Sequence, residues 1–202
     1  MFGERYFFDC WAASPAVYEQ IVLEAENLVR NGVREIMLIA QDSTYYGIDI
    51  YKKRAMSELL KKLSDIEGLE WIRVHYAYPS GFPMDIIEVM SERDNICNYL
   101  DIPLQHGSTR MLKIMRRGIT REKTDKLIAD IREVNPGIAL RTTLIAGHPG
   151  ETEEDFQKYK TAKQKGKNKE LICNGCFEKG CTLRDPKFYT CLLYTSPSPR
   201  DR

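Results

Sequence analysis

The chain has 202 residues, of which 43% are hydrophobic and 29% are charged, and its formal charge at pH 7 is +1. This balance predicts one soluble domain with an appendage. It gives no direct sign of nucleic-acid binding, and no apolar run approaches the roughly 18 residues that cross a membrane. The six cysteines are too few and too scattered for a disulfide scaffold, and the N-terminus lacks a secretory signal, so a cytoplasmic protein is expected.

Helical and strand periodicities alternate along most of the chain. A first helix is predicted from the N-cap Ser14 to Gly32, and Thr120 is predicted to cap a later one. The apolar runs predict strands over 35–40, 71–76, 99–104 and 138–146. The remaining helices are predicted over 56–63, 83–90, 109–115 and 121–134.

Four strands that alternate with helices indicate an α/β fold with a parallel sheet and right-handed crossovers. No Gly-x-Gly-x-x-Gly sequence follows the first predicted strand, which argues against a dinucleotide-binding fold. We therefore predict a partial (β/α) barrel of four parallel strands, followed by a disordered C-terminal tail.

Polar residues gather where the predicted strands end, which is where barrels carry their chemistry. Each of the three histidines, taken alone, is better explained as a structural residue, but all three fall at or just after a strand end. Glycines at the last of these ends also permit backbone amides to meet a carboxylate or phosphate. The strand-end segments are Gln41-Asp42, His75-Tyr76, Gln105-His106 and His148–Glu151.

The segment after residue 158 has a different character. Lysines crowd a stretch with almost no apolar residue, and the last ten residues are of low complexity. Cys173, Cys176 and Cys181 are closely spaced, but only Cys191 could add a fourth ligand, so we predict neither a metal site nor packed structure there.

Five strings in this sequence resemble the radical SAM methylthiotransferase family in order and spacing. The strings Tyr45-Tyr46-Gly47 and His75–Pro79 favour the branch that methylthiolates an aspartate of a small-subunit ribosomal protein over the tRNA-modifying branch. The five strings span residues 39–47, 71–79, 99–106, 115–118 and 140–156.

The resemblance implies that S-adenosylmethionine is bound and is cleaved by a 4Fe-4S cluster, with a second cluster supporting sulfur insertion. It also implies a small-subunit ribosomal protein as substrate and an electron donor such as flavodoxin or ferredoxin. By position, Gln41 and Asp42 would contact the methionine moiety, and Gln105, His106 and Ser108 would lie near the ribose. The residues expected near the carboxylate and adenine are Arg141, Thr143, Gly147, His148 and Pro149.

The chain departs from the family in its cysteines. The family's Cys-x3-Cys-x2-Cys loop is absent, because Cys10 has no partner cysteine near it and Cys97 is expected to be a core residue. We therefore expect no catalytic or metal-binding residues and an inactive fragment. Its predicted parts are a non-matching segment 1–18, a partial barrel 19–158 lacking the first barrel strand, and a low-complexity or artefactual tail 159–202.

Two alternatives stay open. The first is a tRNA methylthiotransferase of the same superfamily. The second is a non-catalytic module that binds S-adenosylmethionine without chemistry.

Overall fold

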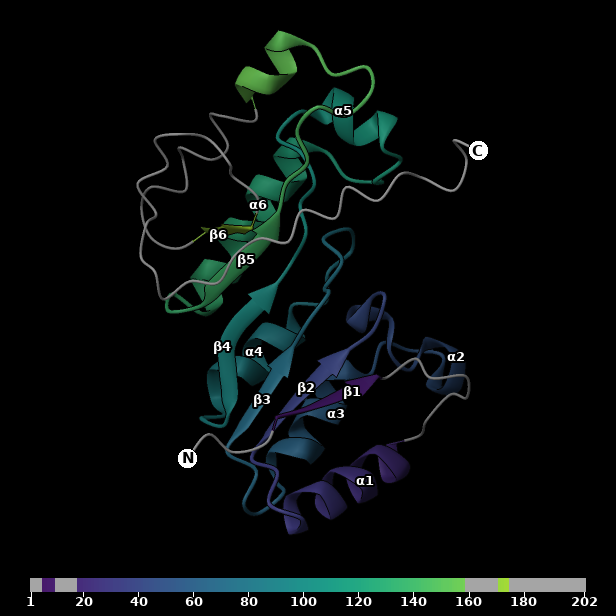
Figure 1. Ribbon diagram of the computed structural model, residues 1–202, viewed down its shortest axis with the longest axis vertical. Helices are drawn as coiled ribbons and strands as arrows, with labels where there is room; N and C mark the ends of the chain where they lie inside the picture. The colour runs from purple at the N-terminus through teal and green to yellow at the C-terminus, as the bar shows by residue number, and fades with distance from the viewer. Residues whose placement is uncertain (1–4, 10–17, 159–170, 175–202) are drawn as a thin grey trace.

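The computed structural model of the chain describes residues 5–9, 18–158 and 171–174 (Figure 1). Its framework is a parallel sheet of six strands in the order β1-β2-β3-β4-β5-β6, which is also their order along the chain. The strands are β1 (Arg5–Asp9), β2 (Glu35–Ile39), β3 (Trp71–Val74), β4 (Ile96–Asp101), β5 (Ala139–Thr143) and β6 (Leu171–Asn174).

The helices connect successive strands. They are α1 (Tyr18–Arg30), the 3-10 helix η1 (Ser43–Tyr45), α2 (Ile48–Tyr51), α3 (Met56–Ser64), α4 (Asp85–Glu92), α5 (Thr109–Ile114) and α6 (Arg121–Val134). Residues 153–158 are also helical. No helix among the described residues is long and apolar enough to pass through a membrane.

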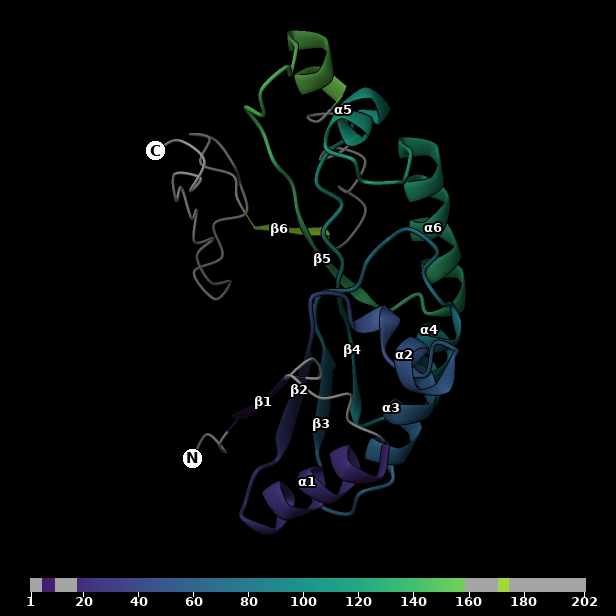
Figure 2. The ribbon, with the colours of Figure 1, turned by 90° about the vertical axis from the view of Figure 1, so that its right-hand side faces the viewer.

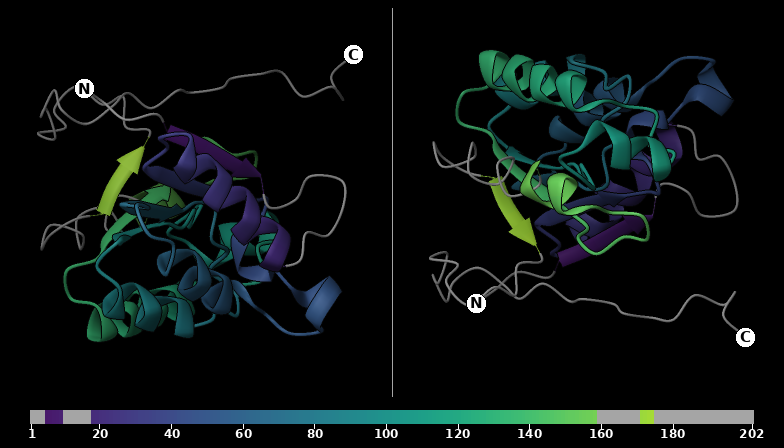
Figure 3. Two further views of the ribbon diagram at one scale, coloured as in Figure 1. Left: turned by 90° about the horizontal axis from the view of Figure 1, so that it is seen from below. Right: turned by 90° about the horizontal axis from the view of Figure 1, so that it is seen from above.

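The helices lie on one side of the sheet, as Figure 2 shows. This follows from the strand order, because right-handed crossovers that always add the next strand at the same edge leave every helix on the same face. Seen along the long axis in Figure 3, the sheet curls so that β1 and β6 lie on the side away from α4 and α6. The architecture is therefore a partial barrel, as the sequence predicts.

The core lies between the sheet and these helices. Alternate strand residues face the helices, and these are apolar: Ile36, Leu38, Ile72, Val74, Ile96, Leu100 and Leu140 are all buried in one cluster. The helices contribute their apolar stripes to the same cluster, with Ile21 of α1, Leu60 of α3 and Ile87 of α4 almost fully buried. The opposite face of the sheet, called the open face here, carries charged residues such as Arg73, Asp101 and Arg141 among apolar and aromatic ones.

All four predicted strands are confirmed, with changed ends. The third starts at Ile96 and ends at Asp101, before Pro103, which has no backbone N–H to donate to a neighbouring strand. The fourth ends at Thr143, because Leu144 forms only an isolated bridge to Gln105. Thr120 caps α6 as predicted, by accepting a hydrogen bond from the Lys123 amide, whereas the predicted cap Ser14 lies outside the described residues.

Two strands were not predicted. Arg5–Asp9 pairs in parallel with β2, which corrects the expectation that no strand precedes it, and Leu171–Asn174 pairs in parallel with β5. Neither segment shows an alternation of apolar and polar residues long enough to predict a strand. Each one forms a strand because it pairs with its neighbour in the sheet. Cys97 also differs from expectation, because it is half-buried on the open face of β4 and not in the core.

Replacing Leu100 with alanine tests the position of the core. Leu100 is 0% exposed, so we expect Leu100→Ala to lower the free energy of unfolding by about 2–5 kcal/mol, through lost burial and the cavity left behind. Urea denaturation followed by circular dichroism measures the change. Leu23→Ala is the matched control, because Leu23 is 56% exposed and should change stability by no more than about 0.5 kcal/mol. Equal effects of the two substitutions would contradict this packing.

Candidate functional site

The carboxyl ends of the strands are joined by backbone hydrogen bonds into one continuous edge. The Ser43 amide after β2 donates to the Tyr76 carbonyl after β3 (3.1 Å), and the Ala77 amide donates to the Asp101 carbonyl of β4 (2.9 Å). The Gln105 amide after β4 in turn donates to the Thr143 carbonyl of β5 (2.9 Å). The strand-end segments predicted from the sequence therefore lie along the same edge.

Gln41 and Asp42 come directly after β2 and have different roles. The Asp42 carboxylate accepts hydrogen bonds from the Thr44 amide (2.9 Å) and the Thr44 hydroxyl (2.6 Å), so it caps the short helix η1. The Gln41 side chain is exposed. Gln41 is thus the exposed side chain of this pair, while Asp42 shapes the loop.

Gln105, His106 and Ser108 follow β4. Gln105 takes the left-handed backbone conformation (φ 69°), which sends the chain away from the strand direction. His106 is 2% exposed, and its Nδ1 accepts a hydrogen bond from the Ser108 amide (2.9 Å). Its Nε2 lies 3.3 Å from Glu151 Oε1. His106 is therefore turned into the protein and fastens its own loop to the loop after β5.

Gly147, His148 and Pro149 form the turn after β5. Gly147 has φ 78°, which favours glycine, and its amide and the His148 amide (3.2 Å) both donate to Glu151 Oε2. The amides that the sequence suggested for an anionic ligand are therefore occupied by the chain's own carboxylate. His148 Nδ1 lies 2.9 Å from the Pro149 carbonyl oxygen. The tautomer with its proton on Nδ1 can donate a hydrogen bond to that oxygen.

A second carboxylate, Asp155, joins the same two loops. It is 2% exposed and accepts hydrogen bonds from the Ser108 hydroxyl (2.6 Å), Arg110 Nε (3.0 Å) and the Thr152 hydroxyl (2.7 Å). The Arg110 side chain and these hydroxyl donors hold the pKa of Asp155 well below its usual range. The roles of Glu151 and Asp155 in joining the two loops were not predicted, although Thr152 and Asp155 have the spacing of a capping box.

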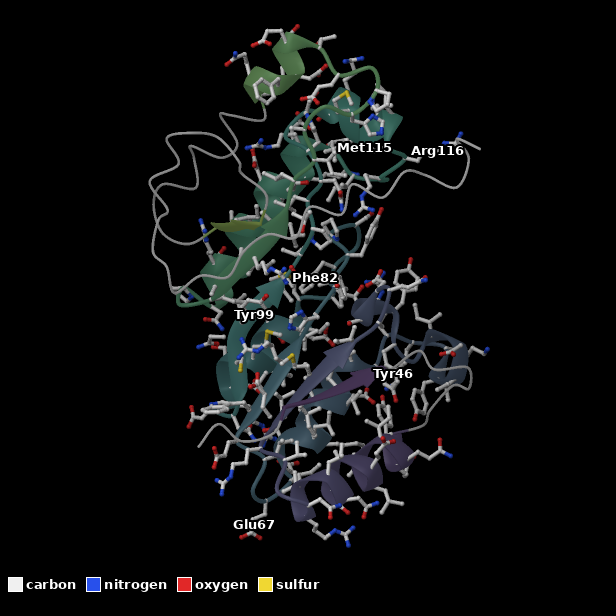
Figure 4. The ribbon with its side chains drawn as sticks, in the orientation of Figure 1. Tyr46, Glu67, Phe82, Tyr99, Met115 and Arg116 are labelled. Carbon is white, nitrogen blue, oxygen red and sulfur yellow. The ribbon has the colours of Figure 1, made fainter. Side chains whose placement is uncertain are left out.

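The open face carries a separate polar cluster. Asp101 of β4 is 3% exposed, and its Oδ2 lies 3.9 Å from His75 Nδ1 and 3.6 Å from Arg141 Nη1 of β5. Burial raises the pKa of Asp101 and lowers the pKa of His75. Tyr99, labelled on β4 in Figure 4, stacks obliquely on the His75 ring with centroids 5.6 Å apart.

The predicted site residues thus fall into two groups. Gln41, Gln105 and Thr143 lie along the strand-end edge with the Gly147–Pro149 turn, whereas Arg141 points to the open face beside Asp101. Asp101 was missed as a site residue, although a carboxylate inside an otherwise apolar strand is itself a signal.

The described residues do not match an iron–sulfur cluster. They contain no group of three His, Cys, Asp or Glu side chains arranged to hold a metal ion. Their cysteines are Cys97 on β4 and Cys173 on β6, while Cys10, Cys176, Cys181 and Cys191 lie outside the described residues. Three thiolates are needed to hold such a cluster, so the described part of the chain does not supply them.

Comparison with known proteins decides the family. The sequence profile described as "Radical SAM superfamily" matches residues 10–161, which is most of the chain. The chain belongs to the radical SAM superfamily.

Two solved structures share its fold at low identity. The radical S-adenosylmethionine methyltransferase TsrM from Kitasatospora setae, with cobalamin and a [4Fe-4S] cluster bound, is 20% identical with a TM-score of 0.56, covering 74% of this chain and 29% of that one. The cobalamin-dependent radical enzyme OxsB is 13% identical with a TM-score of 0.55, covering 72% and 22%.

Curated relatives are much more similar in sequence. The ribosomal protein uS12 methylthiotransferase RimO of Flavobacterium psychrophilum is 60% identical over 159 residues, covering 79% of this chain and 36% of that protein. RimO of Cytophaga hutchinsonii is 63% identical over 140 residues, covering 69% and 32%. The chain therefore spans about one third of the length of these relatives. The match at residue 10 begins earlier than the predicted boundary at residue 19, and the predicted domain boundaries stay predictions.

The pKa of Asp155 predicts a pH-dependent contribution to stability. Because the folded protein lowers this pKa below the ordinary value of about 3.9, the contribution is complete above about pH 4 and is lost as the pH falls through the folded pKa. We expect Asp155→Asn to lower the melting temperature at pH 7. The gap, which is the difference in melting temperature between the variant and the unsubstituted chain, should shrink below pH 4. Thermal melts from pH 7 to pH 3 measure this gap. Glu154→Gln, one position earlier and in an exposed ion pair with Lys158, should leave the melting temperature nearly unchanged. A gap that is constant over the whole range would contradict the lowered pKa.

Proposed function

We propose that this chain is the S-adenosylmethionine-binding part of a cytoplasmic methylthiotransferase that modifies an aspartate of ribosomal protein uS12. The observation that carries the proposal is the 60% identity to the uS12 methylthiotransferase of Flavobacterium psychrophilum over 159 residues. The strand-end edge of the partial barrel supports it, because that edge is where barrels of this kind hold their ligands.

The described side chains divide the binding of S-adenosylmethionine among them in this proposal. Gln41 is placed at the methionine moiety, with Asp42 holding its loop in shape through Thr44. Gln105 borders the ribose, with His106 and Ser108 fixing the loop from behind, and Thr143 lies near the carboxylate and adenine. The turn Gly147–Pro149 lies against the adenine, and Glu151 keeps that turn closed.

The iron–sulfur chemistry is not supplied by the described residues. In the proposed whole enzyme, a 4Fe-4S cluster held by other residues would supply reducing chemistry toward S-adenosylmethionine, and a donor such as flavodoxin or ferredoxin would serve that cluster. The described cysteines do not match such a cluster, so no radical step is derived from them. What the described residues contribute is a shaped, polar edge for the ligand.

A graft into a longer relative tests the proposed function. Residues 19–158 replace the matching segment of the Flavobacterium psychrophilum relative, and mass spectrometry of uS12 records the gain of a methylthio group on aspartate. We expect a rate within about tenfold of the parent enzyme. Gln41→Ala in the graft should lower kcat/KM for S-adenosylmethionine by about tenfold, equivalent to one hydrogen bond of about 1.4 kcal/mol. Gln157→Ala is the matched control, because Gln157 is exposed and contacts Glu153 of its own helix. Modification of tRNA in place of uS12 would establish the alternative function, and a folded graft without either activity would refute the proposal.

Anaerobic iron–sulfur assembly on the purified chain tests the metal prediction. We expect no stoichiometric cluster, because the described residues offer no three-thiolate site. Iron per protein and the absorbance of the thiolate-to-iron band give the result. A full four-iron cluster would show that cysteines outside the described residues take part in binding iron, and that the prediction is wrong.

A further inference from the structure

The cluster on the open face contains two buried hydrogen-bonding atoms that have no partner within the described part of the chain. These are Asp101 Oδ1 and His75 Nε2. Asp101 is 3% exposed, and a buried polar atom without a partner costs about 1–3 kcal/mol. Such atoms are rare in native proteins, so a pair of them on one face points to a group that binds there.

Both atoms are acceptors. The Arg141 guanidinium, 3.6 Å from Asp101 Oδ2, favours the ionised carboxylate form of Asp101, and the same oxygen faces His75 Nδ1 at 3.9 Å. A carboxylate beside Nδ1 favours the tautomer with its proton on that nitrogen, which leaves Nε2 as the acceptor. The group that completes the site must therefore bring hydrogen-bond donors.

The charges of the open face balance one another. Arg73 Nε pairs with Glu35 Oε1 at 3.0 Å, and Arg141 lies beside Asp101 at 3.6 Å. Burial lowers the pKa of His75, so its ring is neutral at pH 7. The site therefore has no net charge, and it contains both hydrogen-bond acceptors and a guanidinium donor. Such a site matches a neutral dipolar group better than an ammonium ion, a carboxylate or a phosphate.

We propose that Asp101, His75 and Arg141 bind the backbone of the acceptor polypeptide through its amide groups. One peptide N–H is donated to Asp101 Oδ1, the next N–H is donated to His75 Nε2, and a peptide carbonyl accepts from Arg141. This inference rests on the proposed function and names the part of the protein substrate that the open face recognises.

The position of the cluster agrees with an extended occupant. Asp101 and Arg141 come from the adjacent strands β4 and β5, and His75 directly follows β3, so the hydrogen-bonding groups follow one another across the sheet. Tyr76, next to His75, is 49% exposed and offers a ring at the strand-end side of the cluster. A peptide lying across these strands would then lead from the open face toward the edge where Gln41 and Gln105 lie. The relatives' name, which specifies a ribosomal protein as substrate, favours a polypeptide over a nucleobase.

Nuclear magnetic resonance of the histidine rings tests this inference on the full chain. The chain has three histidines, so ¹⁵N labelling of histidine gives one pair of ring resonances for each. The probe is the uncharged peptide acetyl-Gly-Asn-Gly-amide. We expect it to shift the Nε2 resonance of His75 in a saturable way and to leave His106 unchanged, because both ring nitrogens of His106 already have partners.

Matched variants and competing ligands make the outcome decisive. Asp101→Asn should weaken the peptide at least fivefold, whereas Asp125→Asn, which changes an exposed aspartate paired with Arg121, should not. His75→Gln is the second variant, should Asp101→Asn fail to fold, and its effect is followed through the Tyr99 ring resonances. The absence of a shift with the peptide, or an equal shift with methylammonium, would overturn the inference. A shift with adenosine or S-adenosylmethionine but not with the peptide would also overturn the inference. It would not affect the proposed function, which the uS12 assay of the graft tests separately.

Discussion

The two faces of the parallel sheet face different surroundings, and the rest of the structure depends on that difference. Successive side chains of a strand point to opposite faces, and every helix lies on the same one. Apolar residues such as Leu38 and Leu100 must therefore alternate with residues that have no helix to pack against. That second set is free to be polar, which is why Arg73, Asp101 and Arg141 can occupy the middle of a sheet without disrupting the core.

Carboxylates organise the edge where the strands end. Glu151 closes the turn after β5 and faces His106. Asp155 accepts hydrogen bonds from Ser108 and Arg110 of the segment after β4. Two loops that are about 45 residues apart in sequence are thereby fastened at two points. Charge-assisted hydrogen bonds of this kind are stronger than neutral ones, so the edge is shaped before any ligand arrives.

The sequence predicted the fold well where periodicity is strong. The uninterrupted apolar run of β2 and the amphipathic pattern of α6 follow from local composition, and the structure confirms both. β1 and β6 escaped prediction because short strands at a sheet's edges are defined by their neighbours. The roles of His106 and Ser108 escaped prediction for a related reason, since spacing along the chain places them at a strand end but does not say which way each side chain turns.

Two residues at the strand-end edge hold an unusual backbone conformation. Tyr76 (φ 58°) and Gln105 (φ 69°) both lie in the left-handed region that favours glycine, at a cost of about 1 kcal/mol each. A selection for heat resistance alone would therefore enrich glycine at both positions. Such variants would keep the backbone path of the loops. They would lose the exposed ring of Tyr76 and the polar amide of Gln105 at the strand-end edge. Thermostability and ligand recognition are thus opposing selective pressures at these two positions, and natural variation there would record which pressure prevailed.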